Sequence, residues 1–147
     1  MKNNVKLVFE NVETGKKEII SLHNTECTVG KNSLASRMAG AEKGQVTYFA
    51  IGTGDVSGGN APDVSDVALV GELIRKQISV RSSTGNTANF RIFFNTSEAN
   101  GTLTEIGLFG DDANITPDSG TLFARAVIDK TKTSAETLTI DWSLDVN

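Results

Sequence analysis

Few side chains in this chain of 147 residues have the type and spacing needed for catalysis or metal binding. His23 is the only histidine and Cys27 is the only cysteine. A general base needs an oriented partner, and a structural zinc site needs about four ligands. Because no other His or Cys can complete such a site, we interpret His23 as a surface residue and Cys27 as a small buried thiol.

The glycine-bearing segments do not match phosphate-binding motifs. A P-loop has the form G-x-x-x-x-G-K-[ST]. Gly30-Lys31 has Thr25 where the first glycine should be and Asn32 where the hydroxyl residue should be. The glycine-rich segment 52–59 is followed by no predicted helix whose N-terminus could hold a phosphate. We therefore expect no cofactor.

The acidic segment 111–118 offers carboxylate and amide oxygens of the kind that bind calcium. It does not match the EF-hand spacing, and Asp/Asn-rich turns are common without a metal. Carboxylate pairs for glycoside cleavage meet only in space, and no particular pair is indicated. With one Trp and one Tyr, the chain has little aromatic surface for sugar stacking. We expect neither a metal site nor an enzyme.

The charge distribution argues against nucleic acid and membrane partners. The formal net charge is −4, and the basic residues form short clusters interleaved with acids. Binding of phosphates needs a concentrated Lys/Arg face. No segment approaches the roughly 18–20 apolar residues of a membrane span, and no apolar region follows the start of the chain as in a secretory signal. We therefore expect the protein to be assembled in a cytoplasm.

The alternation of apolar and polar residues predicts a single β-rich domain spanning 1–147. It is clearest over 137–146, where every second side chain is apolar. Such a strand has one face in a core and the other toward water or a polar partner. The apolar face comprises Leu138, Ile140, Trp142, Leu144 and Val146. Further strands are predicted at 46–51, 88–94, 103–109 and 121–128.

The first part of the chain has the pattern of a β-hairpin. Short β-rich runs at 5–9 and 18–22 flank a turn signal at Gly15. We expect residues 1–29 to form an N-terminal hairpin or an arm exchanged with a neighbouring subunit.

One helix is predicted, at 32–40, with Asn32 or Ser33 as the N-cap and Gly40 as the C-terminal stop. Residues 67–81 mix helical spacing with strand-like alternation, and we interpret them as a short helical turn that leads into a strand. Together these elements predict a mainly β fold, an antiparallel β-sandwich with one short α-helix.

The segment 52–63 is expected to be a long exposed loop. It contains four glycines and a proline, and almost no apolar residues. Long loops in compact domains are either mobile or functional. Its glycines are Gly52, Gly54, Gly58 and Gly59.

Several motifs along the chain occur in a recognisable order. Residues 48–54 form a strand ending in G-T-G, and 69–78 have the form L-x-x-E-x-x-R-x-x-I. E-I-G-L-F-G follows at 105–110, G-T-L-F-A-R-A at 120–126 and L-T-I-D-W-S-L at 138–144. In this order the motifs resemble those of tailed-bacteriophage structural proteins of the tail-fibre and baseplate-associated kind.

The resemblance covers roughly residues 30–146 and implies a virion component that assembles symmetrically, with no catalytic residues. No long extension follows Val146, so we do not expect a complete fibre. The first thirty residues do not match the pattern.

Charged residues within apolar segments are candidates for interfaces. An isolated buried charge is costly, so such residues usually pair, either within one subunit or across a subunit interface. Adjacent aromatic or aliphatic residues in a strand, as in Phe93-Phe94 and Leu108-Phe109, point to opposite faces, so one of each pair must meet a second layer or a partner. The interface candidates are Glu72, Arg75, Glu105, Arg125, Phe94 and Phe109.

Together with the resemblance, these observations lead us to expect a virion structural subunit of a tailed phage, a tail-tip or fibre-attachment building block that contacts copies of itself and other virion proteins. The candidate contact elements are the loop 52–63 and the N-terminal hairpin. Two alternatives remain, a capsid decoration protein at capsomer junctions and a carbohydrate-binding module that recognises a host surface.

Overall fold

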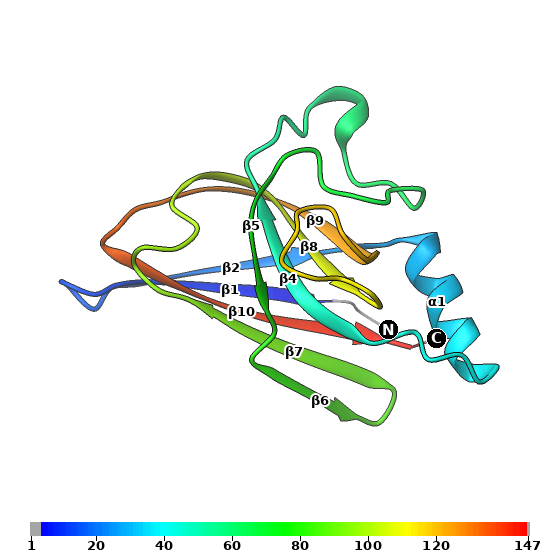
Figure 1. The fold of residues 1–147 in the computed structure, drawn as a ribbon. Coiled ribbons are helices and arrows are strands. Elements are labelled where there is room, and N and C mark those ends of the chain that lie inside the picture. The colour runs from blue at the N-terminus through cyan, green and yellow to red at the C-terminus, as the bar shows by residue number, and fades with distance from the viewer. Residues whose placement is uncertain (1–3, 147) are drawn as a thin grey trace.

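The computed structural model describes residues 4–146, which form two antiparallel five-stranded sheets packed face to face (Figure 1). Sheet A has the order β2-β1-β10-β7-β6 and sheet B the order β3-β9-β8-β4-β5. The predicted β-sandwich with one α-helix is confirmed. The strands of sheet A are β2 (Lys17–His23), β1 (Asn4–Asn11), β10 (Glu136–Asp145), β7 (Thr87–Phe94) and β6 (Val80–Thr84). Those of sheet B are β3 (Thr25–Glu26), β9 (Thr121–Lys132), β8 (Gly101–Gly110), β4 (Val46–Gly52) and β5 (Glu72–Gln77).

The main core lies between the two sheets and follows the predicted alternation. Trp142 on β10 is fully buried, and its ring centroid lies 5.7 Å from that of Phe49 on β4. Leu138, Ile140 and Leu144 share its face and are also buried. Val146 was expected on this face but lies just beyond β10 and is half exposed, so its prediction was wrong.

The predicted N-terminal hairpin is present as β1 and β2. Here β1 also pairs with β10 of the same chain over its whole length, from Asn4 opposite Ser143 to Asn11 opposite Glu136. The hairpin ends at His23, because residues 25–26 form β3 in the other sheet. Residues 1–3 lie outside the described part of the chain.

The helix α1 (Thr28–Met38) begins four residues before the predicted start. Its N-cap is Cys27, which makes no side-chain capping bond, so the expected Asn or Ser cap was wrong. Packing sets the position instead: a Cβ on Gly30 would lie 2.6 Å from Cα of Phe123, so the glycine lets the helix lie against β9. The predicted stop is correct, since Gly40 follows with a φ of +98°.

Residues 67–81 contain no helical turn, contrary to the prediction. They form an irregular approach, then β5 and β6, and the chain passes from sheet B to sheet A at residues 78–79. The helical spacing was misleading because Leu69 is buried against the outer face of sheet B whereas Val70 and Leu73 are exposed.

The outer face of sheet B carries a second, smaller core. Two segments cover this face: loop 53–71 connects β4 to β5, and loop 111–120 connects β8 to β9. Loop 53–71 includes the 3-10 turn η1 (Gly58–Asn60) and is at the top of Figure 1. Leu69 from the first loop and Ala113 from the second pack there. The buried residues of this cluster are Cys27, Ala50, Leu69, Phe109 and Leu122.

Candidate functional site: a loop surface and an end cavity

Glu105 and Arg125 form a buried ion pair beneath loop 53–71. They lie on the adjacent strands β8 and β9, and Nε of Arg125 donates to Glu105 Oε1 at 3.1 Å. The Arg125 guanidinium also donates to the Asp66 carboxylate at 2.8 Å and to the Asn60 carbonyl at 2.9 Å. Both of these acceptors belong to loop 53–71, so Arg125 binds the loop to the sheet.

The Glu105 carboxylate holds the same loop from its other end. It accepts backbone hydrogen bonds from Val70 at 2.9 Å and Gly71 at 2.8 Å. Gly52 and Gly54 leave the space that this requires, because a Cβ on Gly52 would lie 2.6 Å from Glu105 Cγ and one on Gly54 would lie 2.6 Å from the Gly71 nitrogen.

The expected exposure of the glycine loop was therefore wrong for its first part. Gly52 is buried and Gly54 is partly buried, because the loop folds back on β8 and β9. Gly58 and Gly59 are exposed, as predicted.

A second buried ion pair, Glu72 with Arg75, holds loop 111–120. The guanidinium and carboxylate make two parallel hydrogen bonds of 2.8 Å, and each side chain is 1% exposed. Arg75 Nη1 donates to the carbonyls of Asn114 and Ser119, both at 3.0 Å. The guanidinium carbon also lies 4.5 Å from the ring centroid of Phe109, a cation–π arrangement.

A β-bulge explains how residues three apart in a strand can meet. Side chains in a regular strand alternate between faces, so Glu72 and Arg75 would point to opposite sides. Ile74 pairs with Ile51 and Glu72 pairs with the next residue, Gly52, which leaves Leu73 as an extra residue. The bulge returns Glu72 to the face of Arg75 and turns Leu73 outward.

Phe94 and Phe109 do not lie on a surface, which corrects their prediction as interface residues. Both are fully buried, Phe94 in the main core and Phe109 in the second cluster. Leu108 and Phe109 do point to opposite faces, and both faces of sheet B are covered. In the adjacent pair Phe93-Phe94, the Phe94 ring is buried and the Phe93 ring is exposed. All four charged candidates are paired within one chain.

The two fixed loops and the bulge carry exposed aliphatic side chains, which we call the loop surface. Their exposed fractions run from 44% for Val70 to 70% for Ile115. Sequence reasoning missed these residues, although β-branched side chains in turn-rich segments were a visible signal. The loop surface comprises Val64, Val67, Val70, Leu73 and Ile115.

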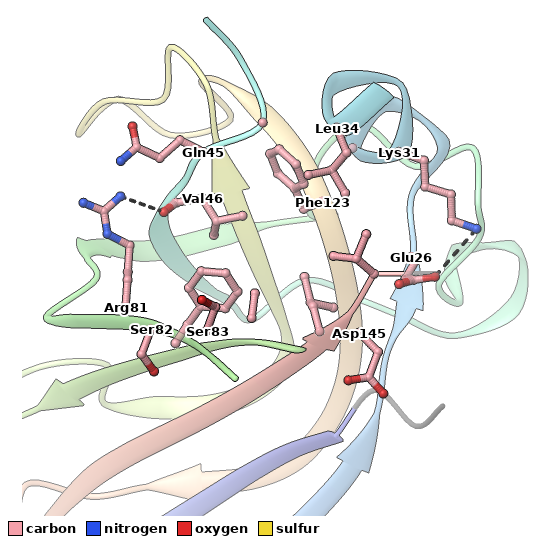
Figure 2. Close-up of a pocket in the computed structure, with 16 residues that line it drawn as sticks. Glu26, Lys31, Leu34, Gln45, Val46, Arg81, Ser82, Ser83, Phe123 and Asp145 are labelled. Carbon is pink, nitrogen blue, oxygen red and sulfur yellow. Dashed lines mark hydrogen bonds and ion pairs between the residues drawn. The ribbon is translucent and has the colours of Figure 1, made fainter. Parts of the chain in front are cut away.

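An end cavity of about 390 Å³ opens between the sheets, near α1 (Figure 2). Several of the residues that line it are small: Gly30, Gly44, Ser83 and Ala88. Its apolar lining comprises Leu34, Val46, Ala88, Phe90, Phe123, Leu144 and Val146.

Charged groups ring this cavity. Nη1 of Arg81 donates to the Val46 carbonyl at 3.2 Å on one side, and Lys31 lies 3.6 Å from Glu26 on the other (Figure 2). Sequence reasoning missed this site because a cavity arises only when two sheets and a helix meet.

The outer face of sheet A is uncovered and largely polar. Arg91 and Asp141, on adjacent strands, make hydrogen bonds of 2.6 and 3.1 Å, and Ser143 donates to the Asn89 side chain at 2.9 Å. These four residues, with Val80 and Ser82, line a shallow groove of about 260 Å³.

The remaining chemical candidates have structural surroundings. Burial, with a smaller effect of the Asp66 carboxylate, raises the pKa of the Cys27 thiol to about 12. In the acidic segment, Asp111 accepts hydrogen bonds from Ser33 Oγ and the Gly44 nitrogen, each at 2.6 Å. Among residues 4–146, no three His, Cys, Asp or Glu side chains are grouped closely enough to hold a metal ion.

Between residues 4 and 146, no helix is both long and apolar enough to cross a membrane. Comparison of the chain with protein-family models, with curated proteins and with solved structures found no match in any of the three.

Proposed function

We propose that this chain is a virion structural subunit of a tailed phage, a tail-tip or fibre-attachment building block assembled in the host cytoplasm, and that it acts through protein interfaces. The observation that carries the proposal is the loop surface. Its aliphatic side chains stand on loops that are tied to sheet B by two buried ion pairs.

Fixed loops favour association because little conformational freedom is lost when a partner binds. Ordering a flexible loop at an interface costs free energy, and a loop that is already ordered avoids most of that cost. Arg125, Glu105, Glu72 and Arg75 hold the loops in place through bonds to backbone groups. The five exposed aliphatic side chains on this scaffold support a contact with another protein.

The residues that hold the loops are also the residues that carry the resemblance to phage structural proteins. Glu72 and Arg75 are the charged positions of the L-x-x-E-x-x-R motif. Glu105 begins the E-I-G-L-F motif, and Arg125 is the arginine of G-T-L-F-A-R. In this chain, the motifs thus have a common physical role, which supports assembly as the function.

The two alternatives make different use of the molecule. A capsid decoration protein would use the same loop surface at capsomer junctions. A carbohydrate-binding module would use the polar groove on sheet A, where Arg91, Asp141, Asn89 and Ser143 offer hydrogen-bonding groups on one face. Specific binding of the isolated protein on a glycan array would favour the latter.

The proposal is tested by looking for the chain in purified particles. We expect mass spectrometry of particles of the phage or prophage that carries the gene to detect the protein, and labelling with an antibody to place it at the tail. Labelling on the head would favour decoration instead. Particles that are complete without the chain would contradict the proposal.

A pair of variants tests the loop surface itself. Val67→Asp combined with Ile115→Asp should abolish incorporation into particles while the isolated protein stays folded. Phe93→Asp is the control, because Phe93 is also exposed but lies on β7 of sheet A, away from both candidate contact elements. Equal incorporation of both variants would exclude the loop surface as the interface.

A further inference from the structure

The strand β6 is an open sheet edge without the usual protection against pairing. Within residues 4–146 it pairs only with β7, and all five of its residues are exposed. Natural edge strands are commonly protected by lysines, prolines, bulges or a covering loop. The sequence of β6, Val-Arg-Ser-Ser-Thr, contains one charged residue and no proline. An additional strand can therefore bind to its free N–H and C=O groups.

The other edges differ from β6. The edge strand β2 begins with Lys17 and Glu18, and β3 is only two residues long. The edge strand β5 contains the bulge at Leu73 and three charged residues. Among the described strands, β6 is thus the edge that is most available for pairing.

The end cavity lies directly beside this edge. Arg81 and Ser83 are the inward-facing residues of β6, opposite Phe90 and Ala88 on β7, and all four line the cavity (Figure 2). A strand added to β6 would place every second side chain on this inner face. Those side chains would enter a space whose lining is mainly apolar.

We propose that β6 and the end cavity together bind an extended segment of another protein, with apolar side chains at alternate positions that enter the cavity. The segment adds a sixth strand to sheet A. The inference rests on the proposed assembly function and names the chemistry of one partner. The cavity volume of about 390 Å³ suits a few side chains rather than a folded domain.

A second copy of this chain fits the site less well. If β6 paired with β6 of another copy, that copy would place Arg81 and Ser83 on the inner face. A guanidinium in an apolar space without a partner is costly, and the space would remain largely unfilled. The apolar lining therefore favours a partner of different sequence.

The charged residues around the mouth of the end cavity indicate which residue types the two ends of the bound segment should carry. Arg81 lies on the β6 side, and the Lys31–Glu26 pair and Asp145 lie on the opposite side. Because both signs of charge are present around an apolar centre, the segment should be apolar in the middle and polar at its ends.

The test is selection from a library of random twelve-residue peptides with the whole chain as bait. We expect enriched peptides with apolar residues at i, i+2 and i+4. A selected peptide should slow hydrogen exchange at residues 80–84. Ala88→Phe, which fills the cavity, should weaken its binding at least tenfold, whereas Ser21→Phe, on the exposed face of β2, should not.

A second variant tests the strand edge. The two-residue turn at Gly85-Asn86 directs the Ser83 N–H to the open side of β6, so Ser83→Pro should also weaken peptide binding at least tenfold. If either variant unfolds, hydrogen exchange at residues 80–84 of the unmodified protein, measured with and without a selected peptide, still tests the proposal.

Three outcomes would overturn the proposal: no enriched peptide, protection confined to the loop surface, or a dimer in sedimentation velocity that Ser83→Pro abolishes. The last would assign the edge to a second copy. These results do not depend on virion incorporation, so failure of this inference and failure of the proposed function are separable.

Discussion

The guanidinium of Arg125 lies 3.1 Å from the carboxylate of Glu105, and neither side chain is more than 2% exposed. Both groups also bind the backbone of loop 53–71, at Asn60 and at residues 70–71. This buried pair therefore links the order of the loop to the integrity of sheet B. Loss of either charge should affect both.

We expect Glu105→Ala to destabilise the protein by about 3–5 kcal/mol, because it leaves Arg125 buried beside a single, partly exposed carboxylate. Urea unfolding followed by circular dichroism measures this. Asp141→Ala is the control, since it breaks the exposed pair with Arg91 and should cost less than about 1 kcal/mol. Equal losses in the two variants would show that the buried pair has no special role.

Exchanging the charges of Glu72 and Arg75 should release loop 111–120. A carboxylate at position 75 would face the carbonyls of Asn114 and Ser119 and the ring of Phe109, all of which bind the present cation. Limited proteolysis should then cut within the loop. The same exchange of Arg91 with Asp141 serves as a control and should leave the cleavage pattern unchanged. Resistance of loop 111–120 in the first variant would contradict this account.

Gly52→Ala should destabilise the protein by roughly 1–3 kcal/mol through overpacking. The added Cβ would lie 2.6 Å from Glu105 Cγ and 2.7 Å from the Gly71 carbonyl oxygen. Gly59→Ala is the matched control because nothing lies within 4 Å of its added Cβ. A lower melting temperature is expected for the first variant only, and a tolerated Gly52→Ala would mean that the loop can move away from β8.

Trp142→Ala should cost about 3–5 kcal/mol as a large truncation in the main core. The indole is fully buried, and its Nε1 donates to the Asn24 side chain at 3.1 Å. Phe93→Ala removes an exposed ring on the neighbouring strand and should cost far less. Chemical denaturation of both variants makes the comparison, and a loss under about 1 kcal/mol for Trp142→Ala would refute the packing of β10.

The Cys27 thiol should be unreactive in the folded protein. Its pKa is raised to about 12, mainly by burial, so little thiolate forms near neutral pH. A thiol reagent should modify it quickly only after denaturation. The folded state holds the thiol proton more tightly than the unfolded state does. The resulting contribution to the free energy of unfolding is fully present below about pH 9 and is lost as the pH rises toward 12. Rapid modification of the native protein would contradict the burial.

The strands were largely predictable because alternation is a local property. It located β1, β4, β7, β8, β9 and β10 to within a few residues. The errors at 67–81 arose from pairing between distant segments, since the bulge at Leu73 exists only opposite β4 and Leu69 is buried only because sheet B lies beneath it.

The charged residues of the candidate site were also visible in the sequence, because a charge within an apolar strand needs a partner. Their partners were only partly predictable. Asp66, Asn60 and Asn114 belong to loops whose paths depend on the folded sheet. For the same reason the burial of Gly52 and the existence of the end cavity could not be deduced from local pattern.

The pairing of β1 with β10 has a consequence for the order of events during synthesis. The two strands are separated by more than a hundred residues, yet they are neighbours in sheet A. Closing so long a loop of chain is slow, and β10 leaves the ribosome only after more than a hundred residues that follow β1 have been made. Until then the apolar side of the β1–β2 hairpin lacks its partner strand. We therefore expect a period during synthesis in which the nascent chain is sensitive to aggregation and a substrate for chaperones.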